Sequence, residues 1–166
     1  MYLSKFNTKC GPMVAIADEE KLHLLEFENR KGLEKEIEQF KLKSKSAIVS
    51  GKNKILSLIE EELTQYFAGT LKNFKTPIAF SGTPFQQKVW KELQNIPYGE
   101  TKSYADIAKA IGKPTGFRAV GNANGSNQLA VIVPCHRVIK SDGKLCGYAA
   151  GIDRKQILLN LEKSGK

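Results

Sequence analysis

A cysteine, a histidine and an arginine follow one another at Cys135, His136 and Arg137, directly after the apolar run 129–133 and Pro134. A thiolate is a strong nucleophile, but a free cysteine has a pKa of about 8.5 and is ionised only to a few per cent at neutral pH. A neighbouring imidazole can take the thiol proton. Residues 134–137 are therefore a candidate site for covalent group transfer.

Local geometry argues against a direct bond between the two side chains. The run 129–133 predicts a short strand that is buried on both faces, and Pro134 ends its ladder because proline has no N–H to donate. Successive residues of a strand point to opposite faces, so Cys135 and His136 meet only if the backbone turns after Pro134 or a water relays the proton. On the dipeptide alone, an inert thiol beside a surface histidine is the commoner interpretation.

The segments before this site predict a helix-turn-helix arrangement. Thr83-Pro84-Phe85-Gln86 combines a capping threonine, a proline at the first helical position and a glutamine three residues after the cap. Ser103 caps a second helix, with Asp106 three residues on, and Gly112 ends it. The third segment, 116–125, is rich in Gly, Ala and Asn, which keeps one helix face small although each glycine costs about 1 kcal/mol. A Gly/Asn-rich loop is the alternative interpretation of this third segment.

The N-terminal half predicts a small α/β unit without evident chemistry. The apolar runs 13–17 and 22–27 predict a hairpin. Apolar residues at helical spacing predict two helices, around 33–40 and 55–67, with the Lys-rich stretch 41–45 between them. We expect this half to be a scaffold.

The chain has 166 residues, of which 41% are apolar and 26% charged, and this predicts a globular protein of at most two compact units. Residues 1–76 hold 13 Lys and Arg against 11 Asp and Glu, whereas residues 77–166 hold 13 against 6. The positive excess thus lies in the second part, where we expect a polyanion to dock; a basic surface without a partner is the equal alternative.

Three features predict a cytoplasmic protein. The start of the chain, Met1 to Lys9, carries lysines and no apolar run, which is unlike a signal peptide, and no segment is long and apolar enough to cross a bilayer. The three cysteines cannot all pair, so reduced thiols are expected. Cys10 and His23 are the two candidate metal ligands before residue 80, and because two ligands do not make a tetrahedral site we expect no metal and no cofactor.

The segment Pro134-Cys135-His136-Arg137-Val138, in this context, resembles the O6-alkylguanine-DNA alkyltransferase family. The match is strong over about residues 83–163 and loose over the first 80. Its other motifs, in the family's order and spacing, are Phe85-Gln86-Gln87-Lys88-Val89-Trp90, Ile96-Pro97-Tyr98-Gly99-Glu100-Thr101, Ser103-Tyr104, Arg118-Ala119-Val120-Gly121, Asn127, Gly147-Tyr148 and Leu161-Glu162.

The resemblance implies an α/β fold of two domains. Residues 1–76 would form a small α/β scaffold domain with an antiparallel sheet. Residues 77–166 would form a mainly helical domain with a winged helix-turn-helix and a short active-site strand. The implied function is repair of O6-alkylguanine, and of O4-alkylthymine as a second lesion, by a methyltransferase that is consumed in one turnover. The implied partner is double-stranded DNA, bound through its minor groove by a protein that is monomeric in solution, with cooperative assembly on DNA left open.

The resemblance also implies a role for each catalytic residue. Cys135 would be the alkyl acceptor, and His136 the base that takes the thiol proton through a water. Glu162, on a closing helix over 157–163, would orient and charge the histidine. Asn127 would be the hinge between the recognition helix and the active-site strand. Tyr104 would donate a hydrogen bond to the departing base.

Arg118 is implied to enter the base stack and fill the gap left by a flipped nucleotide. The other residues implied to contact DNA are Tyr104, Ala119, Gly121 and Ser141, and those implied to line the base pocket are Val138, Tyr148, Ala149 and Ala150. Ala150 departs from the second glycine of many relatives. We expect Cys146 to be structural or incidental, because its spacing from Cys135 matches no redox motif. A thiol hydrolase and a non-enzymatic lesion binder are the competing classes.

Overall fold

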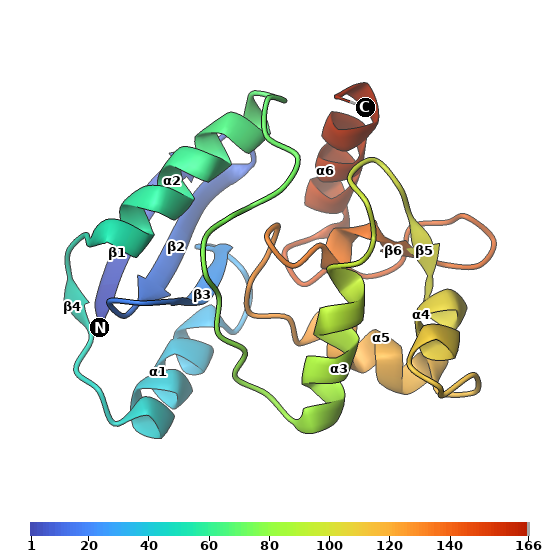
Figure 1. Cartoon of the computed structure of the whole chain (residues 1–166), viewed down its shortest axis with the longest axis horizontal. Helices are drawn as coiled ribbons and strands as arrows, with labels where there is room; N and C mark the ends of the chain where they lie inside the picture. Colours follow the sequence, from blue (N-terminus) through green and yellow to red (C-terminus); the bar gives the residue numbers. More distant parts are fainter. Residues whose placement is uncertain (166) are drawn as a thin grey trace. The chain divides into compact units, whose positions relative to one another are not determined.

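The computed structural model describes residues 1–165, which form two compact units, Met1–Ala79 and a second unit beginning at Phe80 (Figure 1). The N-terminal unit is built on a four-stranded sheet with the strand order β3-β2-β1-β4. The first three strands are antiparallel neighbours, and β4 runs parallel to β1. The strands are β1 (Tyr2–Thr8), β2 (Gly11–Ala17), β3 (Leu22–Phe27) and β4 (Val49–Ser50).

Two helices accompany this sheet, α1 (Leu33–Ser44) and α2 (Lys54–Phe67). Phe40 of α1 packs against Val14, Ile16 and Leu24, which alternate on one face of the sheet, and α2 contacts β1 and β2. The central strand β2 is therefore buried along residues 13–17 on both faces. This double burial explains why its sequence is a continuous apolar run and not an alternating one.

The predicted hairpin over 13–17 and 22–27 is confirmed, with Met13 opposite Phe27. The Lys-rich stretch 41–45 was placed between the two helices, but α1 continues to Ser44 and includes most of it. Lysine is a good helix former, and its charged end remains in water on the outer face of the helix. Strand β1 was missed since only its Phe6 is buried, which leaves no apolar run to detect.

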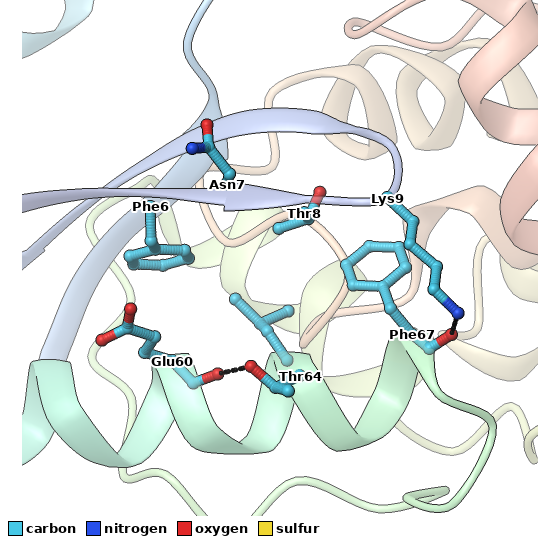
Figure 2. Close-up of a pocket in the computed structure, with 8 residues that line it drawn as sticks. Phe6, Asn7, Thr8, Lys9, Glu60, Thr64 and Phe67 are labelled. Carbon is cyan, nitrogen blue, oxygen red and sulfur yellow. Dashed lines mark hydrogen bonds between the residues drawn. The ribbon is translucent and has the colours of Figure 1, made fainter.

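A pocket of about 330 Å³ lies within the N-terminal unit, between the end of β1 and α2 (Figure 2). Phe6, Leu63 and Phe67 supply its apolar lining, and the Lys9 ammonium donates a hydrogen bond to the Phe67 carbonyl at 3.3 Å. None of the residues expected to act in catalysis or DNA binding lines it.

The second unit is mainly helical, with one two-stranded sheet. In this sheet β5 and β6 are parallel, with Lys102 opposite Val138. The elements are α3 (Pro84–Leu93), β5 (Lys102–Ser103), α4 (Tyr104–Ala110), α5 (Phe117–Gly125), the short 3₁₀ turn η1 (Cys135–Arg137), β6 (Val138–Ile139) and α6 (Ile152–Ser164).

The starts of the first two helices are confirmed in detail. The Thr83 and Ser103 side chains each accept a hydrogen bond from the backbone N–H three residues on, and their own backbone N–H groups donate the reciprocal bonds of a capping box to the side chains of Gln86 and Asp106. Gly112, at φ +77°, follows the end of α4. Helix α5 packs against both α3 and α4, and the Trp90 indole donates to the Ala123 carbonyl at 2.7 Å. The predicted α/β fold class, with a helical second domain, is confirmed.

The predicted strand over 129–133 was wrong. These residues are buried, but residues 130–132 form a turn, and Val131 has φ +72°. An apolar run indicates burial without specifying the backbone conformation. The short strand of this region is β6, which comes after Cys135 and not before it. Within residues 1–165, no helix has both the length and the apolar character to span a lipid bilayer.

Candidate active site

Cys135 is the first residue of the turn η1 and is 6% exposed. The Cys135 amide donates to the Val133 carbonyl at 2.8 Å, and the Arg137 amide donates to the Pro134 carbonyl at 3.0 Å. The Cys135 carbonyl accepts from the Asn124 side chain at 3.3 Å and from the backbone at the end of the turn. The backbone thus turns directly after Pro134, so the extended geometry that would separate Cys135 from His136 is absent from this segment.

His136 is fully buried, and its Nε2 lies 2.6 Å from Oε2 of Glu162 on α6. An ionised carboxylate can only accept hydrogen bonds, so Nε2 carries the proton. The Nδ1 atom of the same ring is buried and has no hydrogen-bond partner among residues 1–165. In the neutral imidazole this atom keeps its lone pair and can accept a proton.

Arg137 holds the other side of the same carboxylate. Its Nε donates to Oε1 of Glu162 at 2.5 Å, and its Nη1 donates to the Ile96 carbonyl at 2.7 Å. Burial raises the pKa of Glu162, but the hydrogen bonds from His136 and Arg137 and their charges outweigh burial and hold this pKa at about 2. Glu162 therefore stays ionised throughout the pH range in which a histidine titrates.

Burial lowers the pKa of His136, and the nearby charges of Arg137 and Lys155 add to this effect, while Glu162 opposes it. The ring is therefore neutral at neutral pH, with Nδ1 unprotonated. Glu162 fixes its tautomer, and Arg137 fixes the charge of Glu162. The three side chains together form a buried base, and its histidine directly follows Cys135 in the sequence.

Asn127 holds the turn segment between α5 and Cys135. Its Nδ2 donates to the carbonyls of Leu129 and Val133, at 3.3 and 2.9 Å, and its Oδ1 accepts from the Leu129 amide at 3.0 Å. Val131 lies inside this loop at positive φ, where a β-branched residue costs on the order of 1–3 kcal/mol. The three hydrogen bonds of Asn127 offset this strain.

We expect Asn127→Ala to lower the free energy of unfolding by about 2–4 kcal/mol, because it leaves buried backbone groups unsatisfied. Urea unfolding measures this change. Asn122→Ala is the matched control, since Asn122 is exposed on α5 and its replacement should change stability by less than about 0.5 kcal/mol. Equal unfolding midpoints for the two variants would contradict the role of Asn127.

A pocket of about 510 Å³ opens beside helix α5. Five of the residues predicted to contact DNA or the base line it: Tyr104, Arg118, Gly121, Tyr148 and Ala149. Val138 is fully buried in β6, while Ala119, Ser141 and Ala150 lie outside the lining of this pocket. Ser141 lines a second hollow of about 440 Å³, together with Tyr104.

Tyr104 stands half-buried at this pocket. Burial, the hydrogen bond with Cys146 and the nearby thiol of Cys135 raise the pKa of Tyr104 to about 12. Its hydroxyl therefore keeps its proton at any physiological pH and can act as a hydrogen-bond donor inside the pocket. The same contact brings Cys146, expected to be incidental, to the pocket wall.

Lys155 was missed by the sequence analysis. Its side chain is fully buried, and its ammonium donates to the carbonyls of Val138 and Cys146 at 2.6 and 2.8 Å. Burial lowers the pKa of Lys155. These two hydrogen bonds link Cys146, in the pocket wall, to Val138 of β6, the strand that directly follows the turn η1. A lysine on a helix normally indicates a solvated face, so nothing in the sequence signalled this role.

Arg137 was named as part of the motif, but no role was given to it, because its partner Glu162 lies on a distant helix. Within residues 1–165, no group of three or more His, Cys, Asp or Glu side chains is arranged to hold a metal ion.

Comparison with known families assigns both halves of the chain. Residues 84–164 match the family described as "6-O-methylguanine DNA methyltransferase, DNA binding domain". Residues 1–80 match "6-O-methylguanine DNA methyltransferase, ribonuclease-like domain". The two matches meet at the connection between the units.

Similar proteins cover nearly the full chain. A methylated-DNA–protein-cysteine methyltransferase of Methanosarcina acetivorans is 44% identical over 99% of both chains. A protein of the same name from Mycobacterium tuberculosis is 59% identical over 63% of both chains.

Two solved structures are also similar. The Mycobacterium tuberculosis OGT in complex with DNA has a TM-score of 0.87 and 41% identity, covering 99% of this chain and 94% of that one. An O6-methylguanine-DNA methyltransferase from Pyrococcus kodakaraensis has a TM-score of 0.68 and 29% identity, covering 96% and 98%.

Proposed function

The chain belongs to the 6-O-methylguanine DNA methyltransferase family, and from this premise we propose which of its residues perform the reaction. The activity is that of a methylated-DNA–protein-cysteine methyltransferase, which repairs O6-methylguanine in DNA by alkyl transfer. Cys135 is the acceptor, and the protein is consumed in one turnover.

The observation that carries this assignment is Nδ1 of buried His136, next to Cys135, which has no hydrogen-bond partner within residues 1–165. The thiol proton passes to Nδ1, directly or through a water, and Glu162 stabilises the imidazolium that forms. The thiolate of Cys135 attacks the alkyl carbon as the bond from that carbon to O6 breaks. The net reaction moves the alkyl group from oxygen to sulfur and a proton from sulfur to guanine. The thioether product has no ready route back to a thiol.

The departing guanine takes the electron pair of the broken bond and develops negative charge. Tyr104 lines the pocket and keeps its proton, because its pKa is raised to about 12. A hydrogen bond from this hydroxyl to the leaving base stabilises the developing charge. Tyr148 and Ala149 line the same pocket and hold the base.

The target carbon is out of reach inside a duplex, so the nucleotide must be extruded, at a cost of a few kcal/mol. Helix α5 is suited to a minor groove because its outer face is small. A methyl group on Gly121 would meet the Tyr104 ring at an ordinary 3.8 Å, and one on Gly125 would meet nothing within 4 Å. Packing within the unit therefore does not require these glycines, whereas close approach of a DNA backbone does.

Exposed Arg118, in the first turn of α5, fills the space of the extruded nucleotide. Ala119 and Gly121 allow the helix to approach the groove, and Ser141 contacts the backbone. A monomer binds one lesion. Because the reaction consumes a reduced thiol, the protein acts in the cytoplasm, where thiols stay reduced.

Incubation with excess duplex DNA that contains O6-methylguanine tests the single turnover. The repaired guanine should reach a plateau at one equivalent per protein, with one methyl group added to the protein, as measured by chromatography of the DNA and intact mass. Product beyond one equivalent, with unmodified protein, would indicate a hydrolase and reject the proposal.

Arg118→Ala should slow transfer from duplex DNA by about 10–100-fold, since the extruded state no longer has the residue that replaces its stacking. Transfer from the free methylated base should fall much less, because nothing has to be extruded. Single-turnover kinetics with both substrates measure the two effects.

Lys113→Ala is the matched control for charge. Lys113 is exposed in the turn between α4 and α5 and lines neither pocket. Its replacement should weaken duplex binding only through the missing attraction to phosphates. In a plot of log affinity against log salt concentration, the slope should become shallower by about 0.9 for each phosphate that the lysine neutralises. If Arg118→Ala slowed both substrates equally, the extrusion role would be rejected.

A further inference from the structure

Helix α5 begins with an exposed aromatic residue, Phe117, directly before Arg118. Phe117 is 51% exposed and is the aromatic member of the large apolar side chains exposed within residues 1–165. About half of the surface of this residue is therefore open to a partner. The position lies on the element that approaches DNA in the proposed function, so nucleic acid is the natural partner for the exposed ring.

Phe117 lies where two hollows meet. One is the pocket of about 510 Å³ that takes the extruded base, and the other is the hollow of about 440 Å³ lined by Ser141 and Asp142. Tyr104, Phe117 and Lys140 line both of them. An extruded base in the first hollow would therefore leave its neighbour in the strand close to the second.

Phe117 and Arg118 cannot perform the same task. Successive residues of a helix point about 100° apart, so the two side chains leave α5 in different directions. Residues four apart share a face, and Gly121, four residues after Phe117, has no side chain. A side-chain carbon added at Gly121 would lie 3.8 Å from the Tyr104 ring, so this face of α5 is turned toward Tyr104, and the Phe117 and Tyr104 rings line the second hollow together.

The second hollow suits a flat, uncharged group. Its lining holds one cation, Lys140, and one anion, Asp142, together with the rings of Tyr104 and Phe117. The two charges offset each other, which disfavours a phosphate as the occupant. A nucleobase face is flat and uncharged, and extrusion of a nucleotide exposes one such face on the base beside it.

We propose that the Phe117 ring stacks on the base next to the extruded nucleotide in the damaged strand, so that Phe117 and Arg118 stabilise opened DNA by two separate contacts. This inference rests on the proposed function, because it needs an extruded nucleotide. Stacking of a base on an aromatic side chain contributes about 1–3 kcal/mol. Apolar side chains act as wedges between base steps in other minor-groove proteins.

Two variants and one control test the stacking. Phe117→Ala should weaken binding to duplex DNA that contains O6-methylguanine by about 5–150-fold, the affinity equivalent of the missing stacking. Phe117→Trp should retain the wild-type affinity, because it keeps an aromatic face. Ile157→Ala is the control, since Ile157 is 48% exposed on α6 and lines neither hollow. Fluorescence anisotropy measures all four affinities.

A fluorescent 2-aminopurine placed next to the lesion reports the stacking itself, because stacking quenches its emission. Its emission in the complex should rise with Phe117→Ala and stay low with Phe117→Trp. Affinity and emission equal to those of Ile157→Ala would overturn the proposal. Equal reductions of transfer from duplex and from free methylated base would also overturn it, since Phe117 would then be a wall of the pocket. Affinity and emission can be measured even if the wild type transfers no methyl group. A failure of the proposed function, seen as absent transfer, is therefore distinguishable from a failure of the stacking proposal.

Discussion

Replacement of Cys135 by serine abolishes alkyl transfer: intact mass is expected to show no added methyl group after incubation with one equivalent of methylated duplex, where the wild type gains one. The substitution keeps the size of the side chain in a buried turn, so the fold should survive. A hydroxyl is a far weaker nucleophile than a thiolate, because its pKa is too high for His136 to ionise it to a useful extent. DNA binding should remain, since the acceptor atom does not hold the duplex.

Cys10→Ser is the matched control, a change of the same atom at a buried cysteine of the N-terminal unit. It should gain one methyl group like the wild type. Peptide mapping then decides between Cys135 and Cys146, because both thiols lie near Tyr104. A methyl group that persists in Cys135→Ser, located on Cys146, would move the acceptor role to the second thiol.

The parts of the fold that local sequence predicts are those with local causes. The capping boxes at Thr83 and Ser103 need only residues three positions apart, and both predictions are confirmed. The hairpin of β2 and β3 follows from two apolar runs and one short turn. The strand over 129–133 was wrong because an apolar run indicates burial and not a backbone conformation, and the side chain of Asn127 supplies hydrogen bonds that a sheet would otherwise provide.

In the candidate site, too, features with local causes were predicted and features that depend on distant residues were not. Cys135 and His136 are adjacent in sequence and could be singled out by residue type, but the turn that makes their chemistry feasible could not be predicted. The pairing of His136 with Glu162 was implied only by family resemblance, because the two lie 26 positions apart. Lys155 and the ion pair of Arg137 depend on which carbonyls and carboxylates reach them in three dimensions. No spacing rule encodes such contacts.

Glu162→Gln should slow alkyl transfer by about 100-fold or more, since general-base catalysis contributes about 10²–10⁴-fold. A neutral amide no longer stabilises the imidazolium of His136, and its N–H₂ group can reverse the tautomer, which places the proton on Nδ1. The variant should also be less stable by about 3–5 kcal/mol, because Arg137, only 6% exposed, keeps its charge but no longer has a carboxylate to neutralise it. Single-turnover kinetics and urea unfolding measure the two effects.

The pH dependence separates the charge of Glu162 from its shape. In the wild type its pKa is about 2, below the ordinary 4.5, so its contribution to stability is complete above pH 4.5 and is lost as the pH falls toward 2. The stability gap between wild type and Glu162→Gln should therefore be constant from pH 7 to 5 and narrow below 4.5. Burial holds the pKa of His136 below the ordinary 6.5, so its imidazole remains an unprotonated base as the pH falls through 6.5. Wild-type transfer should therefore stay fast over this pH range.

Glu62→Gln is the matched control for burial of a carboxylate. Glu62 is 5% exposed in the N-terminal unit and accepts hydrogen bonds from Lys75 and Thr76. Its replacement should destabilise that unit without slowing alkyl transfer. If both variants were less stable but neither was slower, Glu162 would be a structural anchor of α6, and His136 would act as a base without a charged partner. If only Glu162→Gln is slower, the negative charge of Glu162, which Arg137 holds in place, must act on the thiol through His136.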